Sequence, residues 1–208
     1  MGYDKMSIKE GMENRRTIYA LNKSIPVDKK RIQEVVRTAI ETVPSSFNLQ
    51  SARLVVLRGD EHDKFWGFTR DILKSVVPED KWEYTRARVQ GFNDAFGTVL
   101  FYEDPEPVKM LQSKFPQYAD KFPHWSEHTS AMHQYALWTS LEAEGFGCNL
   151  QHYNPLPDQK AAETWNIPLE WSLKAQLVFG GLKDRARENL AARVQTKPVE
   201  ERVFVHGG

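Results

Sequence analysis

A stretch of neutral polar side chains, Pro44-Ser45-Ser46-Phe47-Asn48-Leu49-Gln50-Ser51, lies between a helix pattern and a short apolar run. The hydroxyls of Ser45 and Ser46 and the carboxamides of Asn48 and Gln50 are neutral donors and acceptors, which suit the edge of a planar polar ring. Loops held between rigid elements often carry binding residues. The alternative is an ordinary helix-to-strand turn, because Ser and Asn are common turn residues.

Two adjacent arginines followed by a threonine, Arg15-Arg16-Thr17, could hold a phosphate group. Guanidinium groups bind phosphate oxygens bidentately, and the hydroxyl of Thr17 adds a neutral donor. The same pair can also be an ordinary solvated surface, since exposed arginines are easily hydrated. On these residues alone the solvated surface is favoured, and the position of the pair ahead of the first strong helix pattern, rather than within one, adds weight to the phosphate site.

Three further patterns predict no site. Gly145-Phe146-Gly147 begins like a dinucleotide-binding loop, but Leu150 stands where a third glycine is needed, and the segment follows a helix instead of a strand. Cys148 is the only cysteine, which leaves no internal redox pair, so redox chemistry would need a bound cofactor. His128 and His133 lie roughly 140° apart around a helix, so we expect no metal site there.

Composition and charge limit the class of partner. The chain has 208 residues, of which 40% are apolar, and this predicts a single folded domain over residues 1–208. The 28 basic residues balance the 28 acidic ones, so no long-range field attracts nucleic acid or an anionic membrane. No signal-peptide pattern or bilayer-length apolar run is present, which predicts a cytoplasmic protein.

The first half of the chain alternates helix and strand patterns. Residues 28–43 have apolar side chains at helical spacing, with Asp28 as the N-cap, and Pro44 ends this helix. Strand patterns cover residues 52–57 and 97–102, and helix patterns cover residues 61–77 and 79–93. The polar loop therefore directly precedes a sheet strand.

The second half begins with a segment rich in aromatic residues, 108–125. We expect it to be irregular, with short helical pieces that Pro116 and Pro123 interrupt, and it could cover a binding site. A helix pattern that is apolar around most of its circumference follows over residues 127–144 and ends at Gly145. The remaining patterns are strands at 146–153 and 173–179, a helix at 158–165 and an edge strand at 203–205, which could pair within this chain or with a partner subunit. The predicted class is α+β.

Four motifs in this order resemble the flavin-dependent nitroreductase family, and the resemblance is closest to its small fungal and bacterial branch. They are Arg15-Arg16-Thr17, the loop from Pro44 to Gln50, Gly145-Phe146-Gly147 continuing into Leu150-Gln151-His152-Tyr153-Asn154-Pro155, and Lys197-Pro198-Val199-Glu200-Glu201. The resemblance implies a mostly antiparallel sheet flanked by helices, with one long buried helix. It also implies an intertwined homodimer that binds FMN at its interface, with the N-terminal arm (1–24) and the C-terminal extension (about 189–208) in the dimer contact.

The resemblance also implies which residues bind FMN. Arg15, Arg16 and Thr17 match the family's phosphate and ring contacts, and Lys197 matches its C-terminal phosphate-binding cation. Ser45, Ser46, Asn48 and Gln50 match the loop along the flavin of the opposite subunit, and Leu150, Gln151 and His152 match the segment beside the isoalloxazine ring. The chain departs from better-known members at His152 and Tyr153, where an acidic residue and a glycine are common. The middle-chain contact has no clean counterpart, and Arg86, Arg88 and Gln90 are candidates.

The implied activity is hydride transfer from NAD(P)H through FMN to a nitroaromatic, a quinone or a similar flat acceptor, with ping-pong kinetics. The flavin carries the chemistry, so no catalytic side chain is required. The alternative is a flavin-binding regulator or an FMN-sequestering protein with little turnover, since the fold would be the same.

Overall fold

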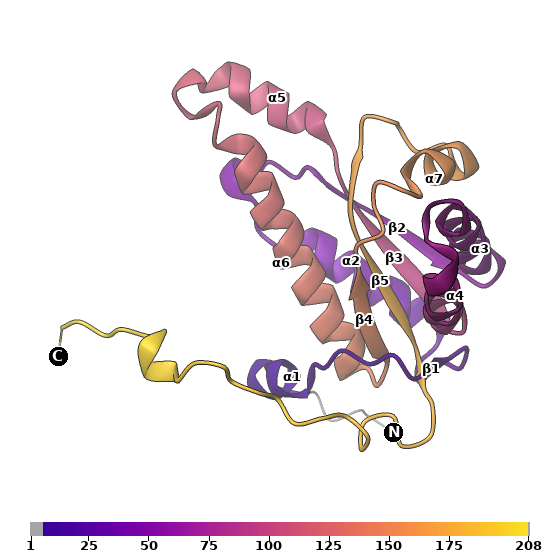
Figure 1. Ribbon diagram of the computed structural model, residues 1–208. Helices are drawn as coiled ribbons and strands as arrows, with labels where there is room; N and C mark the ends of the chain where they lie inside the picture. Colours follow the sequence, from indigo (N-terminus) through magenta and orange to yellow (C-terminus); the bar gives the residue numbers. More distant parts are fainter. Residues whose placement is uncertain (1–5, 208) are drawn as a thin grey trace.

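The structure is a computed structural model, and it describes residues 6–207 of the chain. Its centre is an antiparallel sheet (Figure 1). Strand β2 (Ala52–Arg58) pairs with β3 (Gly97–Glu103), and β3 pairs with the long strand β5 (Ser172–Leu182). On its other side β5 pairs with β4 (Gly147–Gln151), and near its end with the short strand β1 (Leu21–Asn22). The predicted mostly antiparallel sheet is confirmed.

Helices cover both faces of the sheet (Figure 1). Helices α2 (Lys29–Thr42) and α6 (Phe122–Ala143) pack on one face, and α3 (Asp60–Val76), α4 (Glu79–Asn93) and α7 (Asp158–Trp165) pack on the other. Successive residues of β3 point to opposite faces, so Val99 and Phe101 join the core under α2 and α6, whereas Leu100 and Tyr102 join the core under α3 and α4. The burial of β3 on both faces explains its continuous apolar sequence.

Helix α2 forms as its sequence predicts. Asp28 is the N-cap, and its carboxylate accepts a hydrogen bond from the backbone N–H of Arg31 at 2.7 Å. Ile32, Val35 and Ala39 are the buried side chains, which is the helical spacing expected. The helix ends at Thr42, directly before the polar loop, so it fixes one end of that loop.

The expectation of short helical pieces interrupted at Pro116 and Pro123 is confirmed at Pro116, before which a helix ends, and is wrong at Pro123. Helix α5 (Pro105–Lys114) and a 3-10 turn, η2 (Pro116–Tyr118), occupy most of it, and α6 already starts at Phe122. Pro123 lies in the first turn of α6, where a backbone N–H has no helical partner to lose, so the proline does not interrupt this helix. Helix α5 projects beyond the end of the sheet (Figure 1).

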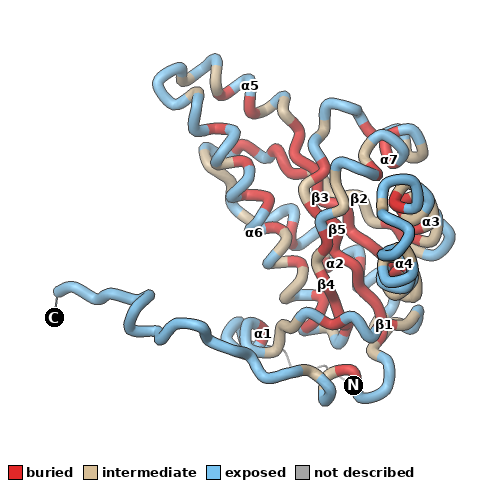
Figure 2. The backbone as a smooth tube through the Cα atoms, viewed as in Figure 1, coloured by how far each residue is buried: buried red, intermediate tan, exposed pale blue. Residues whose placement is uncertain are grey.

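Both ends of the chain differ from expectation. The N-terminal arm contains a helix, α1 (Ile8–Asn14), whose first turn is closed by a capping box between Ser7 and Glu10. The C-terminal extension runs away from the domain as exposed chain with one 3-10 turn, η3 (Val199–Glu201) (Figure 2). Residues 203–205 are not assigned to a strand, because no backbone within residues 6–207 forms a strand pair with them.

No helix within residues 6–207 is both long enough and apolar enough to span a bilayer.

Candidate active site

The paired arginines lie in a hollow of about 320 Å³, here called the arginine hollow, lined by Arg15, Arg16, Thr17, Arg193, Val194 and Gln195. The guanidinium of Arg193 donates to the backbone carbonyls of Glu13 and Arg15, and that of Arg16 donates to the carbonyl of Ala191. No carboxylate in the described part of the chain pairs with Arg15, Arg16 or Arg193. The hollow therefore carries uncompensated positive charge.

Strand β4 leads from the arginine hollow toward Gln151. Thr17 forms a parallel bridge with Cys148, and the backbone N–H of Ile18 donates to the Cys148 carbonyl at 2.8 Å. Backbone groups two residues apart on a strand face the same side, so the N–H and C=O of Leu150 also face this edge, away from β5. Gln151 is buried and donates to Asn149 at 2.8 Å, and His152 follows as an exposed side chain.

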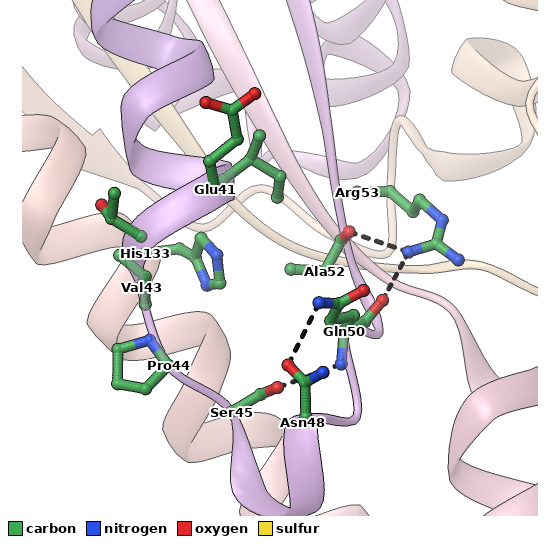
Figure 3. Close-up of a pocket in the computed structure, with 11 residues that line it drawn as sticks. Glu41, Val43, Pro44, Ser45, Asn48, Gln50, Ala52, Arg53 and His133 are labelled. Carbon is green, nitrogen blue, oxygen red and sulfur yellow. Dashed lines mark hydrogen bonds between the residues drawn. The ribbon is translucent and has the colours of Figure 1, made fainter.

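The loop before β2 is a 3-10 turn, η1 (Ser46–Asn48), closed by its own side chains. The Ser45 hydroxyl accepts the backbone N–H of Gln50 at 3.0 Å, and the Gln50 carboxamide donates to Asn48 at 3.1 Å (Figure 3). Ser45, Asn48 and Gln50 line a hollow of about 550 Å³, here called the amide hollow, together with His133 of α6 and Arg53 of β2. The structure thus brings together Ser45, Asn48 and Gln50, whose side chains are predicted to contact the edge of a planar ring, whereas Ser46 is not among the lining residues.

Left-handed backbone makes this loop costly. Phe47, Asn48 and Gln50 have φ values of 55°, 52° and 51°. Asn tolerates this region, but it costs a residue such as Phe about 1–2 kcal/mol. The Phe47 ring offsets part of that cost through contacts with four aromatic residues, since it stacks on Trp125 with 6.0 Å between ring centroids and also meets Phe115, Tyr118 and Phe122.

A buried carboxyl group anchors the C-terminal end of the same loop through a hydrogen bond. Glu103, at the end of β3, accepts hydrogen bonds from the hydroxyls of Ser51 and Ser126. Burial raises the pKa of Glu103, and these two hydroxyls oppose the rise. Ser51 directly follows Gln50, so the end of the loop is tied both to the sheet and to α6.

The structure separates the three middle-chain candidates. Arg86 pairs with Glu83 at 2.8 Å, and the carboxamide of Gln90 donates to Asp94 at 2.9 Å. Arg88 has no carboxylate partner among the described residues. Its guanidinium lies 5.1 Å from the ring centroid of Tyr19 in a hollow of about 280 Å³, lined also by Tyr84, Ala87, Gly91 and Phe92. Tyr19 is two residues after Thr17, so Arg88 is the candidate nearest along the fold to the arginine hollow.

One cationic residue of the arginine hollow is absent from the sequence prediction. Arg193 lines the hollow, whereas Lys197 is exposed on the C-terminal extension beyond it. No local pattern distinguishes Arg193 from the other charged residues near it, and its contact with Arg15 spans 178 residues. The assignment of Lys197 stays a prediction.

The chain is similar to known proteins along most of its length. Residues 12–181 match the sequence profile of the Nitroreductase family. The chain belongs to the nitroreductase family. HBN1 of Saccharomyces cerevisiae, a candidate nitroreductase, is 41% identical over 168 residues, which cover 80% of this chain and 83% of HBN1.

Solved structures extend this comparison to the fold. Nitroreductase CinD from Lactococcus lactis, determined with nicotinic acid, is 42% identical with a TM-score of 0.86, covering 97% of this chain and all of CinD. The FMN-dependent nitroreductase NfnB from Mycobacterium smegmatis, determined with NADPH, shares the fold at 11% identity with a TM-score of 0.71, covering 96% of this chain and 97% of NfnB. The nitroreductase-like fold is thus confirmed, and with it the fold of flavin-dependent oxidoreductases.

Proposed function

We propose that this protein is an FMN-dependent NAD(P)H oxidoreductase that reduces flat acceptors such as nitroaromatics and quinones. The observation that carries the proposal is the arginine hollow. Three guanidinium groups without carboxylate partners gather there beside the hydroxyl of Thr17, at one end of the open edge of β4.

The donor set of that hollow fits a phosphate monoester. None of the residues that line it is acidic, and Arg and Thr supply charged and neutral donors. Farther along β4, the backbone of Leu150 and the buried amide of Gln151 offer the polar groups that a flavin ring edge requires. We therefore assign the phosphate to Arg15, Arg16 and Thr17, with Lys197 and Arg193 as cations of the C-terminal extension.

Bound FMN would supply the hydride chemistry, taking two electrons from NAD(P)H and giving them to the acceptor. The residues of this chain bind and orient it. Arg88 would stabilise the negative charge that reduction adds to the pyrimidine edge, because a guanidinium without an anionic partner is free to meet one. His152 is the exposed polar side chain next to Gln151 and would contact the ring or the acceptor.

We also propose a homodimer in which Ser45, Ser46, Asn48 and Gln50 of one subunit face the flavin of the other. Exposed apolar side chains support this arrangement, since a single chain leaves them in water. Met132 and Tyr135 of α6 are 41% and 43% exposed, and Phe204 of the C-terminal extension is 72% exposed. The extension would lie across the partner subunit.

Absorbance and turnover test the proposal. The purified protein should show a yellow flavin spectrum or acquire it with added FMN, and it should oxidise NAD(P)H when a nitroaromatic or quinone is present. Double-reciprocal plots at several acceptor concentrations should be parallel, which is the pattern of a ping-pong mechanism. A protein that takes up no FMN contradicts the proposal. Tightly bound FMN that NAD(P)H does not reduce favours a flavin-binding regulator or an FMN-sequestering protein instead.

A further inference from the structure

A buried carboxylate stands behind the arginine hollow without lining it. Glu142 lies in the last turn of α6, and its side chain has no solvent exposure. One oxygen, Oε2, accepts the backbone N–H of Arg16 and the Nη2 of Arg187, both at 3.0 Å. The other, Oε1, accepts the indole N–H of Trp138 at 2.7 Å. Both carboxylate oxygens are therefore hydrogen-bonded.

The partners of Glu142 lead directly to the phosphate-binding candidates. The Trp138 ring lies under the guanidinium of Arg15, with 4.4 Å between the guanidinium carbon and the ring centroid. Arg187 also donates to the backbone carbonyl of Asn14 at 3.1 Å. Glu142 thus fixes the backbone of Arg16 by direct contact and holds the Trp138 ring that lies under Arg15. Through Arg187 it also fixes the backbone of Asn14.

Stability alone does not explain a carboxylate at this position. Burying a charge is expensive, and a well-packed apolar side chain often stabilises a fold equally well. The ion pair with Arg187 neutralises Glu142, and the Glu142 carboxylate lies outside the hollow. An anion in the hollow therefore meets the guanidinium groups of Arg15, Arg16 and Arg193 without facing an unpaired negative charge.

We propose that Glu142 is a positioning residue, which holds the segment from Arg15 to Thr17 in the geometry that selects a flavin carrying a phosphate monoester over the same flavin without one. This inference rests on the proposed function. It adds that the discrimination between FMN and riboflavin depends on a residue that contacts neither molecule. Any general effect of Glu142 on folding would weaken the binding of both flavins equally.

The test compares flavin dissociation constants in the full-length protein. Quenching of flavin fluorescence gives the dissociation constants for FMN and for riboflavin, measured for the wild type and for Glu142→Gln and Glu142→Ala. Glu144→Gln is the matched control, because Glu144 is two residues farther on and pairs with Arg31 of α2 at 2.6 Å, away from the hollow. Circular dichroism and thermal melting establish that each variant is folded.

The wild type should prefer FMN strongly. Glu142→Ala should weaken FMN binding by about tenfold to a hundredfold, the range for losing one charge-assisted contact to the phosphate, while riboflavin binding changes less than about threefold. Glu142→Gln keeps the side-chain volume and one acceptor oxygen, so its loss should be smaller than that of Glu142→Ala. Glu144→Gln should keep the wild-type preference.

Equal weakening of FMN and riboflavin in both Glu142 variants overturns the inference, because it identifies a structural role only. An unchanged preference in both Glu142 variants overturns it as well. If the wild type binds riboflavin as tightly as FMN, the arginine hollow does not bind the phosphate group of FMN. That result contradicts the inference about Glu142 but leaves the proposed flavin site intact. If the wild type binds neither flavin, the proposed function fails together with the inference.

Discussion

Acid should destabilise this protein in part through the buried side chain of His62. His62, in the first turn of α3, is fully buried and shares a hydrogen bond between its Nδ1 and the Thr98 hydroxyl at 2.9 Å. Burial lowers the pKa of His62 from 6.5 to about 4, and the nearby carboxylate of Asp63 only partly opposes this. Between these pH values the unfolded chain carries a proton on His62 that the folded chain does not carry, so stability falls as pH falls from 6.5 toward 4.

The size of the effect follows from that pKa. At about 1.4 kcal/mol per pH unit, proton binding to the unfolded chain should remove about 2 kcal/mol of unfolding free energy between pH 7 and pH 5. Glutamine at position 62 does not titrate, so the unfolding free energy of His62→Gln should lack the His62 contribution to the decline between pH 7 and pH 5. The variant should nevertheless have a lower unfolding free energy than the wild type at pH 7. Glu103, whose pKa is raised by burial, contributes with the opposite sign in both proteins and cancels in their difference.

Urea unfolding at pH 7, 6 and 5, followed by tryptophan fluorescence, measures this difference. FMN and protein concentrations must be held constant, because ligand binding and association both shift apparent stability. His128→Gln, which replaces an exposed histidine of α6, controls for the loss of one imidazole. Parallel curves of unfolding free energy against pH for the wild type and His62→Gln would refute the reasoning.

Three further predictions concern the proposed site. Phe47→Leu should raise the KM for a flat aromatic acceptor about threefold to tenfold in steady-state assays, because aromatic contacts are lost beside the flavin loop, while Phe68→Leu, on the other side of the sheet, should not. Arg88→Gln should lower the flavin reduction potential by about 30 mV in redox titrations, which is about 1.4 kcal/mol for two electrons; an unchanged potential would exclude Arg88 from the flavin edge. Removal of residues 190–208 should yield a monomer by gel filtration that does not retain FMN, and a dimer that still holds FMN would contradict the proposed role of the extension.

Helices and strands could be predicted where the spacing of apolar residues in the sequence matches the side chains that are buried in the fold. Helix α2 follows its apolar spacing and its Asp28 cap, and β3 follows its continuous apolar run. Helix α1 was not predicted because it buries only Gly11 and so leaves no apolar periodicity. Its only sequence signal is the capping box formed by Ser7 and Glu10.

The site could be predicted only in part, because its remaining residues act through contacts that local sequence does not encode. The polar character of Ser45, Asn48 and Gln50 is visible in the sequence, but the left-handed backbone at Phe47 is set by the aromatic residues that surround its ring. Glu142 lies at the end of a mostly buried helix, and its role depends on contacts with residues distant in sequence, such as Arg16, which is 126 residues away.

Those long contacts have a consequence for the order in which the protein is made. Arg15 and Arg16 leave the ribosome well before the residues that orient them, because Glu142 lies 126 residues after Arg16 and Arg193 lies 178 residues after Arg15. Closing loops of this length is slow compared with forming local helices. The nascent chain should therefore be unable to hold its cofactor until Arg193 has left the ribosome, so flavin uptake would follow the synthesis of that segment.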